Sequence, residues 1–247
     1  MPDPLLIRYM QPLITGRRTE CFELIRDALT TTSAEEILCD VIWPAMGQVE
    51  RLYNDDRINT AIEHMAARIN RTVADQLQIA LPKVPTTGKR AIVVSAGTEG
   101  EELGAQMCTD LLESKGWEVF FVGAGVPHDE ILALVGEHRP NMLLIFGTES
   151  EQVPACRQLI GLIRDIGVCP TMNIVTSGGI FARADGLWQE MGADVCYPTV
   201  RDMLERIDDL KAREPSKPRK SIVKKRNRKR KSTPATATSA TTAAVFA

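Results

Sequence analysis

Residues 91–122 read AIVVSAGTEGEELGAQMCTDLLESKGWEVFFV, and this stretch decides the fold. It opens on a continuous apolar run, Ala91–Ser95, passes through a helical segment near Glu101–Lys115, and closes on a second apolar run, Val119–Val122. A strand, a crossover helix and a second strand form the unit from which parallel sheets are built. Strands of such sheets are buried on both faces, which explains runs that are apolar throughout.

The same alternation of strand and helix continues toward the C-terminus. Further strands are predicted at Met142–Phe146, Asn173–Thr176 and Val195–Tyr197, with helices near Asp129–Glu137, Val153–Asp165, Ala182–Met191 and Val200–Arg213. Five repeats over residues 90–213 predict the α/β class, with a flavodoxin-like (Rossmann-like), doubly wound parallel five-stranded sheet. Ligands bind such sheets beyond the carboxyl ends of the strands, so the loops there are the candidate site.

The N-terminal part has a different periodicity. Residues 1–81 carry apolar side chains at steps of three and four, which predicts an all-α cap in the form of a four-helix bundle. The helices are expected near Leu5–Ile14, Arg18–Leu29, Ser33–Asn54 and Asn59–Leu81. Ser33 followed by Glu36 is the pattern of a capping box. Residues 82–89 are predicted to be a linker.

The C-terminal residues 214–247 differ again in composition and are predicted to be a disordered basic tail. Residues 217–231 hold ten Lys or Arg and no acid, so the other 20 of the 30 basic residues face all 32 acids. Two interpretations stay open for this stretch, a weak and salt-dependent contact with nucleic acid or a solvated tail.

Several function classes lack their sequence signals. The chain has no GxxxxGK[ST] phosphate loop, no complete GxGxxG, no nucleophile elbow and only three dispersed histidines. Its six cysteines are scattered without a CxxC pair, as in a reduced compartment. No apolar run has the length of a membrane span. We therefore expect a cytoplasmic protein that is not an enzyme and has no contact with membranes.

Three stretches together resemble a known family. The run VIWPAMGQVERLY ends at Tyr53 and is followed, after nine intervening residues, by Glu63 and His64. Residues 99–127 read EGEELGAQMCTDLLESKGWEVFFVGAGVP, and residues 176–199 read TSGGIFARADGLWQEMGADVCYPT. These stretches resemble the cobalamin (vitamin B12)-binding module, a helical cap on a flavodoxin-like domain. The module occurs in methionine synthase, corrinoid methyl-carrier proteins and B12-dependent light-sensing repressors.

The resemblance, which spans residues 5–213, implies a corrinoid such as adenosylcobalamin between the cap and the strand ends. It implies that Tyr53, Glu63 and His64 contact the upper face of the corrinoid, with His64 as the candidate cobalt ligand. Helical spacing alone also allows His64 to be an ordinary surface residue, and Tyr53 to pack inside the bundle. Both interpretations stay open.

The first loop departs from the family pattern. The family has Asp-x-His-x-x-Gly, whose histidine binds cobalt from below, whereas this chain has Glu99-Gly-Glu101-Glu-Leu-Gly104. Glu101 at the ligand position offers a hard oxygen donor in place of imidazole nitrogen, which argues against a methyl carrier. It does not argue against B12, because the vitamin can keep its own benzimidazole base. Acids also suit the start of a helix for electrostatic reasons alone.

Two further loops complete the predicted site. The family has a serine after the third strand, and here Gly147, Thr148 and Ser150 are candidates for that position. The resemblance implies that Ser177, Gly178 and Gly179 let the backbone approach the nucleotide tail of the cofactor. A plain strand-to-helix turn would also explain the two glycines.

The predicted function is a non-catalytic, cobalamin-binding sensor. In this hypothesis light, or exchange of the upper ligand, moves the cap and signals to a protein partner, with self-association as a further expectation. A second hypothesis is a sensor or binding protein for another tetrapyrrole, because Glu99 and Glu101 can accept hydrogen bonds from the pyrrole N–H groups of biliverdin, another bilin or a porphyrin. A third is a corrinoid carrier subunit of a methyltransferase system.

Overall fold

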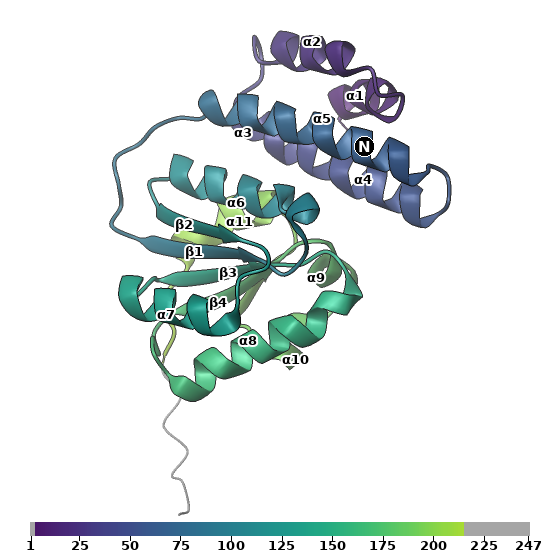
Figure 1. Ribbon diagram of the computed structural model, residues 1–247. Helices are drawn as coiled ribbons and strands as arrows, with labels where there is room; N and C mark the ends of the chain where they lie inside the picture. Colours follow the sequence, from purple (N-terminus) through teal and green to yellow (C-terminus); the bar gives the residue numbers. More distant parts are fainter. Residues whose placement is uncertain (1–2, 215–247) are drawn as a thin grey trace, which may run out of the picture. The chain divides into compact units, whose positions relative to one another are not determined.

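The computed structural model describes residues 3–214, so the predicted basic stretch 217–231 lies outside the described residues. The first part of the chain is helical, as predicted (Figure 1). Its elements are α1 (Pro4–Ile14), α2 (Arg18–Ala28), α3 (Ala34–Ile37), the π-helical turn η1 (Leu38–Ile42), α4 (Trp43–Asn54) and α5 (Thr60–Ile79). The capping box of Ser33 and Glu36 is formed at the start of α3.

The segment predicted as one helix, Ser33–Asn54, is continuous but changes its winding at η1. Pro44 lies in the first turn of α4 and has no backbone N–H to donate. Its ring would also clash with the carbonyl four residues earlier in an ordinary α-helix. The backbone N–H of Trp43 instead donates to the carbonyl of Leu38, five residues back, which is the π-helical pattern.

The second part of the chain is a five-stranded sheet in which all neighbouring strands are parallel. The strands are β1 (Arg90–Ser95), β2 (Glu118–Gly123), β3 (Met142–Phe146), β4 (Asn173–Ser177) and β5 (Val195–Tyr197), in the spatial order β2-β1-β3-β4-β5. This is the flavodoxin-like order, and it confirms the predicted fold class. The chain reverses its direction of winding between β1 and β3, so a ligand site is expected there.

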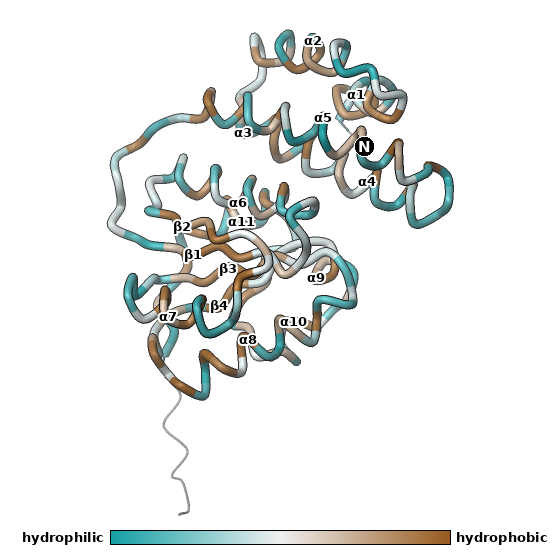
Figure 2. Tube along the Cα trace, in the orientation of Figure 1, coloured by the Kyte–Doolittle hydropathy of each residue, from teal (hydrophilic) through white to brown (hydrophobic). Residues whose placement is uncertain are grey.

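Helices cover both faces of the sheet (Figure 1). On one face lie α6 (Leu103–Ser114) and α11 (Val200–Arg206), and on the other lie α7 (His128–His138), α8 (Val153–Ile166) and α10 (Leu187–Met191). Alternate strand residues point to opposite faces. In β3, Leu144 packs with α6 and the helical region, whereas Leu143 and Ile145 pack with α7 and α8. The strands are hydrophobic along their length for this reason (Figure 2).

Two C-terminal helices are shorter than the sequence predicts. The segment Ala182–Met191 contains the end of α9 (Gly179–Arg183) and all of α10, separated by a turn. Gly186 in that turn has a φ of +76°, which no helix accommodates. The last predicted helix ends as α11 at Arg206, followed by a 3-10 turn, Ile207–Asp209.

Polar pairs join the helical region to α6. Gln78 of α5 donates to Asp110 of α6 over 2.7 Å, and Gln106 of α6 donates to Asp75 of α5 over 2.7 Å. Asp110 is 4% exposed, and its second carboxyl oxygen has no hydrogen-bond partner. Burial, together with the nearby carboxylate of Glu113, raises the pKa of Asp110 to about 7.

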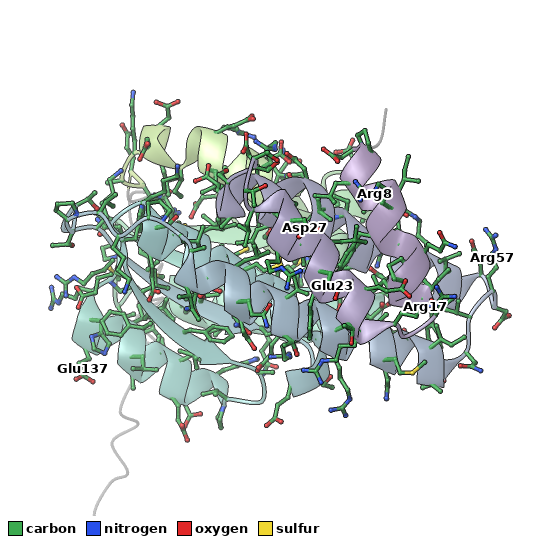
Figure 3. All side chains as sticks on the ribbon, turned by 90° about the horizontal axis from the view of Figure 1, so that it is seen from above. Arg8, Arg17, Glu23, Asp27, Arg57 and Glu137 are labelled. Atoms are coloured by element: carbon green, nitrogen blue, oxygen red, sulfur yellow. The ribbon has the colours of Figure 1, made fainter. Side chains whose placement is uncertain are left out.

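Charged side chains cover the outward surfaces of α1 and α2. Arg8, Arg17, Glu23 and Asp27 are exposed and project away from the apolar interior (Figure 3). Among residues 3–214, no helix is both long enough and apolar enough to cross a membrane.

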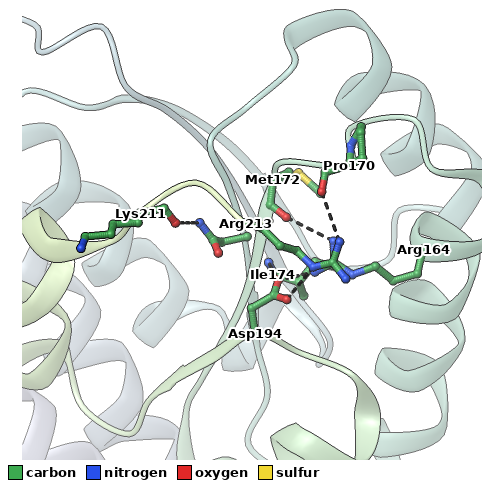
Figure 4. A network of polar contacts seen from close by, with 8 residues as sticks. Arg164, Pro170, Met172, Ile174, Asp194, Lys211 and Arg213 are labelled. Atoms are coloured by element: carbon green, nitrogen blue, oxygen red, sulfur yellow. Dashed lines mark hydrogen bonds and ion pairs between the residues drawn. The ribbon is translucent and has the colours of Figure 1, made fainter. Parts of the chain in front are cut away.

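The amino end of the sheet is held by a polar network around Asp194, which directly precedes β5 (Figure 4). The Asp194 carboxylate accepts hydrogen bonds from Arg213 over 2.9 Å, from the backbone N–H of Ile174 over 2.7 Å, and from Arg164. The Arg213 side chain also donates to the carbonyl of Pro170 over 3.2 Å. The network therefore fixes the end of the described chain against the start of β4.

Candidate functional site

A cleft of about 930 Å³ lies at the carboxyl ends of the strands, between the helical region and the α/β part. Its walls come from α4 and α5 on one side and from the loops after β1, β3, β4 and β5 on the other. This is the position at which ligands bind in flavodoxin-like sheets, and the volume is in the upper range of ligand pockets.

The helical wall carries three of the residues predicted from the sequence. Tyr53, near the end of α4, and Glu63 and His64, in the first turns of α5, all line the cleft. The His64 Nε2 atom lies 3.5 Å from the Glu63 carboxylate, while the His64 side chain is 65% exposed. The Tyr53 hydroxyl shares a hydrogen bond of 3.4 Å with Thr60. Tyr53 and His64 therefore face the cleft and do not pack inside the bundle.

Glu101 lies at the opposite wall, in the loop between β1 and α6. One of its carboxyl oxygens accepts hydrogen bonds from the Thr98 backbone N–H over 2.7 Å and from the Thr98 hydroxyl over 2.9 Å. The other accepts from the Thr148 hydroxyl over 2.9 Å and from the Gln152 amide over 3.2 Å. A carboxylate has about four acceptor positions, and these four bonds use them.

The hydrogen bonds of Glu101 have an electrostatic consequence. Burial alone would raise its pKa, but the hydrogen bonds from Thr98, Thr148 and Gln152 outweigh burial and hold the pKa below its ordinary value of 4.5. Glu101 is therefore an anion that joins the loop after β1 to the loop after β3. Its lone pairs are directed at protein donors, which leaves it unsuited to bind a metal from below.

The structure brings only some of the predicted site residues together. Thr148 and Gly179 line the cleft, together with Glu101 and Gly104. Four others lie outside the lining, namely Glu99, Ser150, Ser177 and Gly178. Glu99 and Ser150 are exposed, and Ser177 is fully buried within β4. Of the candidates after the third strand, Thr148 is thus the hydroxyl that reaches the cleft.

Phe146, the last residue of β3, is a cleft residue that the sequence analysis did not single out. Its ring is 4% exposed and packs edge-on against the ring of Trp43 in α4, with centroids 5.9 Å apart. A Cβ atom added to Gly104 would lie 2.1 Å from the ring, and one added to Gly178 would lie 3.0 Å from it. The ring therefore occupies the space that these two glycines leave open.

A second missed feature crosses the cleft. Arg183 of α9 pairs with Glu50 of α4 over 2.7 Å and also donates to the carbonyl of Thr148. Glu149, which follows Thr148 in the chain, has a raised pKa, mainly because it is partly buried and also because the Glu50 carboxylate is near. No short-range sequence pattern links Glu50 with Arg183, which are 133 positions apart. Alternation along β3 does place Phe146 on the same face as Leu144, and this signal was available.

Within residues 3–214, no three His, Cys, Asp or Glu side chains come together as a metal-binding group. The helical wall offers His64 as an imidazole donor that lines the cleft, and the loop wall offers backbone at Gly100, Gly104 and Gly179. A wide cleft with small residues on one wall fits a flat macrocycle that brings its own metal.

Comparison with protein families gives matches over both parts of the chain. Residues 89–208 match a family model described as a B12 binding domain, and residues 6–78 match a second model with the same description. The two matches confirm the predicted resemblance and the predicted corrinoid cofactor. They favour a corrinoid over a bilin or a porphyrin.

Relatives align over most of their length. Dimethylamine corrinoid protein 1 of Methanosarcina mazei is 23% identical over 198 residues, which cover 79% of this chain and 90% of that protein. Dimethylamine corrinoid protein 3 of Methanosarcina acetivorans is 24% identical, with coverage of 79% and 91%. The solved structure of the Methanosarcina barkeri monomethylamine corrinoid protein superposes with a TM-score of 0.72 at 15% identity, covering 83% of this chain and 97% of that one. The last likeness is one of fold.

Proposed function

We propose that this chain, which belongs to the family of B12-binding modules, is a corrinoid-carrying subunit that presents its cofactor to a separate methyltransferase. The observation that carries the proposal is the cleft, whose walls are the helical part and the strand ends and whose volume of about 930 Å³ has room for one large ligand. The relatives named above are corrinoid proteins and are matched over about nine tenths of their length. They support the carrier hypothesis more than the sensor hypothesis.

The residues proposed to hold the corrinoid come from both walls of the cleft. Tyr53 and His64 would contact it from the helical side, with Glu63 orienting the imidazole through their 3.5 Å pair. Gly179 would let the backbone approach it from the loop side. A bound corrinoid supplies a cobalt that can accept a methyl group and release it.

Arg183 and Glu50 have a separate role in this proposal. Their ion pair joins α9 to α4 across the cleft, so a partner that reaches the upper side of the cofactor has to displace the helical part or break the pair. Both side chains are partly exposed, at 48% and 26%. Exposed ion pairs contribute about 0–1 kcal/mol, so breaking this one is a small obstacle.

One observation favours the sensor as a second candidate. Glu101 stands where methyl carriers of the family have a histidine that tunes cobalt, and four hydrogen bonds from protein donors already use the acceptor positions of its carboxylate. A sensor that responds to light or to exchange of the upper ligand does not need that tuning. Its partner would then be a signalling protein, and its response would include a change in self-association.

The two candidates give different results in one experiment. The protein loaded with reduced cobalamin is mixed with dimethylamine and a methyltransferase, and the visible spectrum is followed in the dark and under illumination. A carrier forms the methylated corrinoid in the dark and only with the methyltransferase present. A sensor changes its spectrum and its oligomeric state on illumination, without the methyltransferase. Absence of methylation in every condition would contradict the carrier proposal.

A further inference from the structure

We propose that this chain binds its corrinoid with the nucleotide tail outside the α/β part, because the Phe146 ring fills the space that the tail would enter. The inference rests on the proposed corrinoid binding and concerns how the cofactor is held. It reverses the role that the resemblance implies for Gly178, a glycine expected to let the backbone approach the tail.

The Phe146 ring is enclosed by protein. Phe146 is 4% exposed and lies between the first turn of α6, the loop after β4 and α4. A Cβ atom on Gly104 would lie 2.1 Å from its Cζ atom, far inside van der Waals contact. Gly104 is therefore a glycine because an aromatic ring rests on its backbone. The space beside it is already filled by protein.

The backbone at Gly178 is closely packed against its neighbours. This residue has a φ of +105°, and a Cβ atom there would lie 2.3 Å from the carbonyl oxygen of Gly147 and 3.0 Å from Phe146. Close packing of the loops after β3 and β4, together with the ring, accounts for the glycine without a ligand. Gly178 also lies outside the lining of the cleft.

The described residues of the loop wall offer no anchor for a displaced tail. A cofactor gives up its own base more easily where the protein supplies another nitrogen donor and a hydrogen-bonding partner for the freed base. Glu101 supplies no nitrogen, and the Thr148 hydroxyl already donates to it. Among the described residues of the loop wall, none offers an imidazole. The benzimidazole of the vitamin is then free to remain on its own cobalt.

The test compares two corrinoids that differ in the tail. The full chain is titrated with hydroxocobalamin and with aquacobinamide, which lacks the nucleotide tail, and binding is followed by visible absorption. We expect dissociation constants within about threefold of each other, because the tail makes no contact with the α/β part. Cobalamin binding that is tighter by about a hundredfold would overturn the inference but leave corrinoid binding intact. Failure to bind either corrinoid would instead overturn the proposed function.

A spectroscopic measurement identifies the base. After reduction to the Co(II) state, the electron paramagnetic resonance spectrum of bound cobalamin should show the splitting by one nitrogen, and bound cobinamide should not. The cobalamin splitting should persist in the His64→Ala variant, which removes the imidazole of the opposite wall. Loss of the splitting in that variant, or its absence from the unsubstituted protein, would contradict a retained base.

A substitution tests the ring itself. In Phe146→Ala the space beside Gly104 opens, and the preference for cobalamin over cobinamide should rise by about tenfold. Leu144→Ala is the matched control, since it removes a buried side chain from the same face of β3 without opening that space. Phe146→Leu is the smaller change if the alanine variant does not fold. An unchanged preference in a folded Phe146 variant would overturn the inference.

Discussion

The two ends of the sheet use a carboxylate in opposite ways. At the amino end, Asp194 is paired with two guanidinium groups and a backbone N–H (Figure 4). At the carboxyl end, Glu101 accepts four hydrogen bonds, all from neutral donors. The carboxylate of Asp194 therefore has cationic partners, whereas the carboxylate of Glu101 has none within its network. The comparison indicates that one end of the sheet is fixed for stability, whereas the other keeps an anion beside an open cleft.

The substitution expected to change the free energy of unfolding most is one that breaks the network around Asp194. Asp194→Asn leaves Arg164 and Arg213 without their counter-charge. The loss is costly because each side chain in the network is only about a fifth exposed. Removing one partner of such a pair should lower the free energy of unfolding by about 3 kcal/mol. Urea denaturation measures it. Glu20→Gln, which breaks an exposed pair with Arg17, is the control and should cost less than about 1 kcal/mol. Equal losses would contradict the account of Asp194.

The next effect concerns packing at the carboxyl end. Gly104→Ala forces the Phe146 ring to move and should lower the free energy of unfolding by about 2 kcal/mol. Gly161→Ala, also within a helix but with no atom within 4 Å of the added Cβ, should raise it by about 0.5–1 kcal/mol. Thermal or urea unfolding of both variants gives the comparison. A stable Gly104→Ala protein would show that Phe146 is not held as described.

Asp110 is a third carboxylate, and it differs from Asp194 and Glu101 because only Gln78 donates a hydrogen bond to it. Asp110, with a pKa raised to about 7, destabilises the fold increasingly as pH rises from about 4 through 7, since the unfolded carboxyl ionises first. Asp110→Asn removes this penalty and should raise the free energy of unfolding at pH 8 by on the order of 1–2 kcal/mol. At pH 4 the two proteins should be nearly equal. A variant that is less stable at pH 8 would contradict the raised pKa.

The smallest effect belongs to Glu101. Its pKa lies below the ordinary value in the folded chain, so its stabilising contribution is present at neutral pH and is lost as pH falls below about 4. Glu101→Gln should lower the free energy of unfolding at pH 7 by about 1 kcal/mol, because an amide cannot accept all four bonds. The difference should shrink toward pH 3. Unfolding curves at both pH values measure it, and a difference that grows in acid would contradict the assignment.

Sequence patterns predicted the fold well because they are local. Continuous apolar runs place β3 and β5 at the residues found, and the βαβ alternation gives the parallel sheet. The prediction of one helix over Ala182–Met191 was wrong, because helical periodicity overlooked Asp185-Gly186, a dipeptide typical of turns, in which Gly186 has a positive φ. The unwinding before Pro44 was equally invisible to helical periodicity.

The site was harder to predict, because its key contacts join distant loops. Glu101 stands where a cobalt ligand was expected, but the pattern Thr98-x-x-Glu101 is itself that of a capping box, and the structure forms it. That signal was present in the sequence. The spacing of Gly104 was attributed to a cofactor, whereas its nearest partner is Phe146, 42 positions away in the chain. Contacts of this kind have no local signature.

Corrinoid binding by the cleft is measured on the unsubstituted chain and on variants of the helical wall. The chain is incubated with hydroxocobalamin, free ligand is removed, and the visible spectrum gives the corrinoid bound per chain. His64→Ala and Tyr53→Ala should each weaken binding by about tenfold. His138→Ala, a histidine stacked on Phe120 at 3.9 Å on the far face of the sheet, should leave it unchanged. About one corrinoid per unsubstituted chain is the predicted result, and a colourless protein would contradict the account.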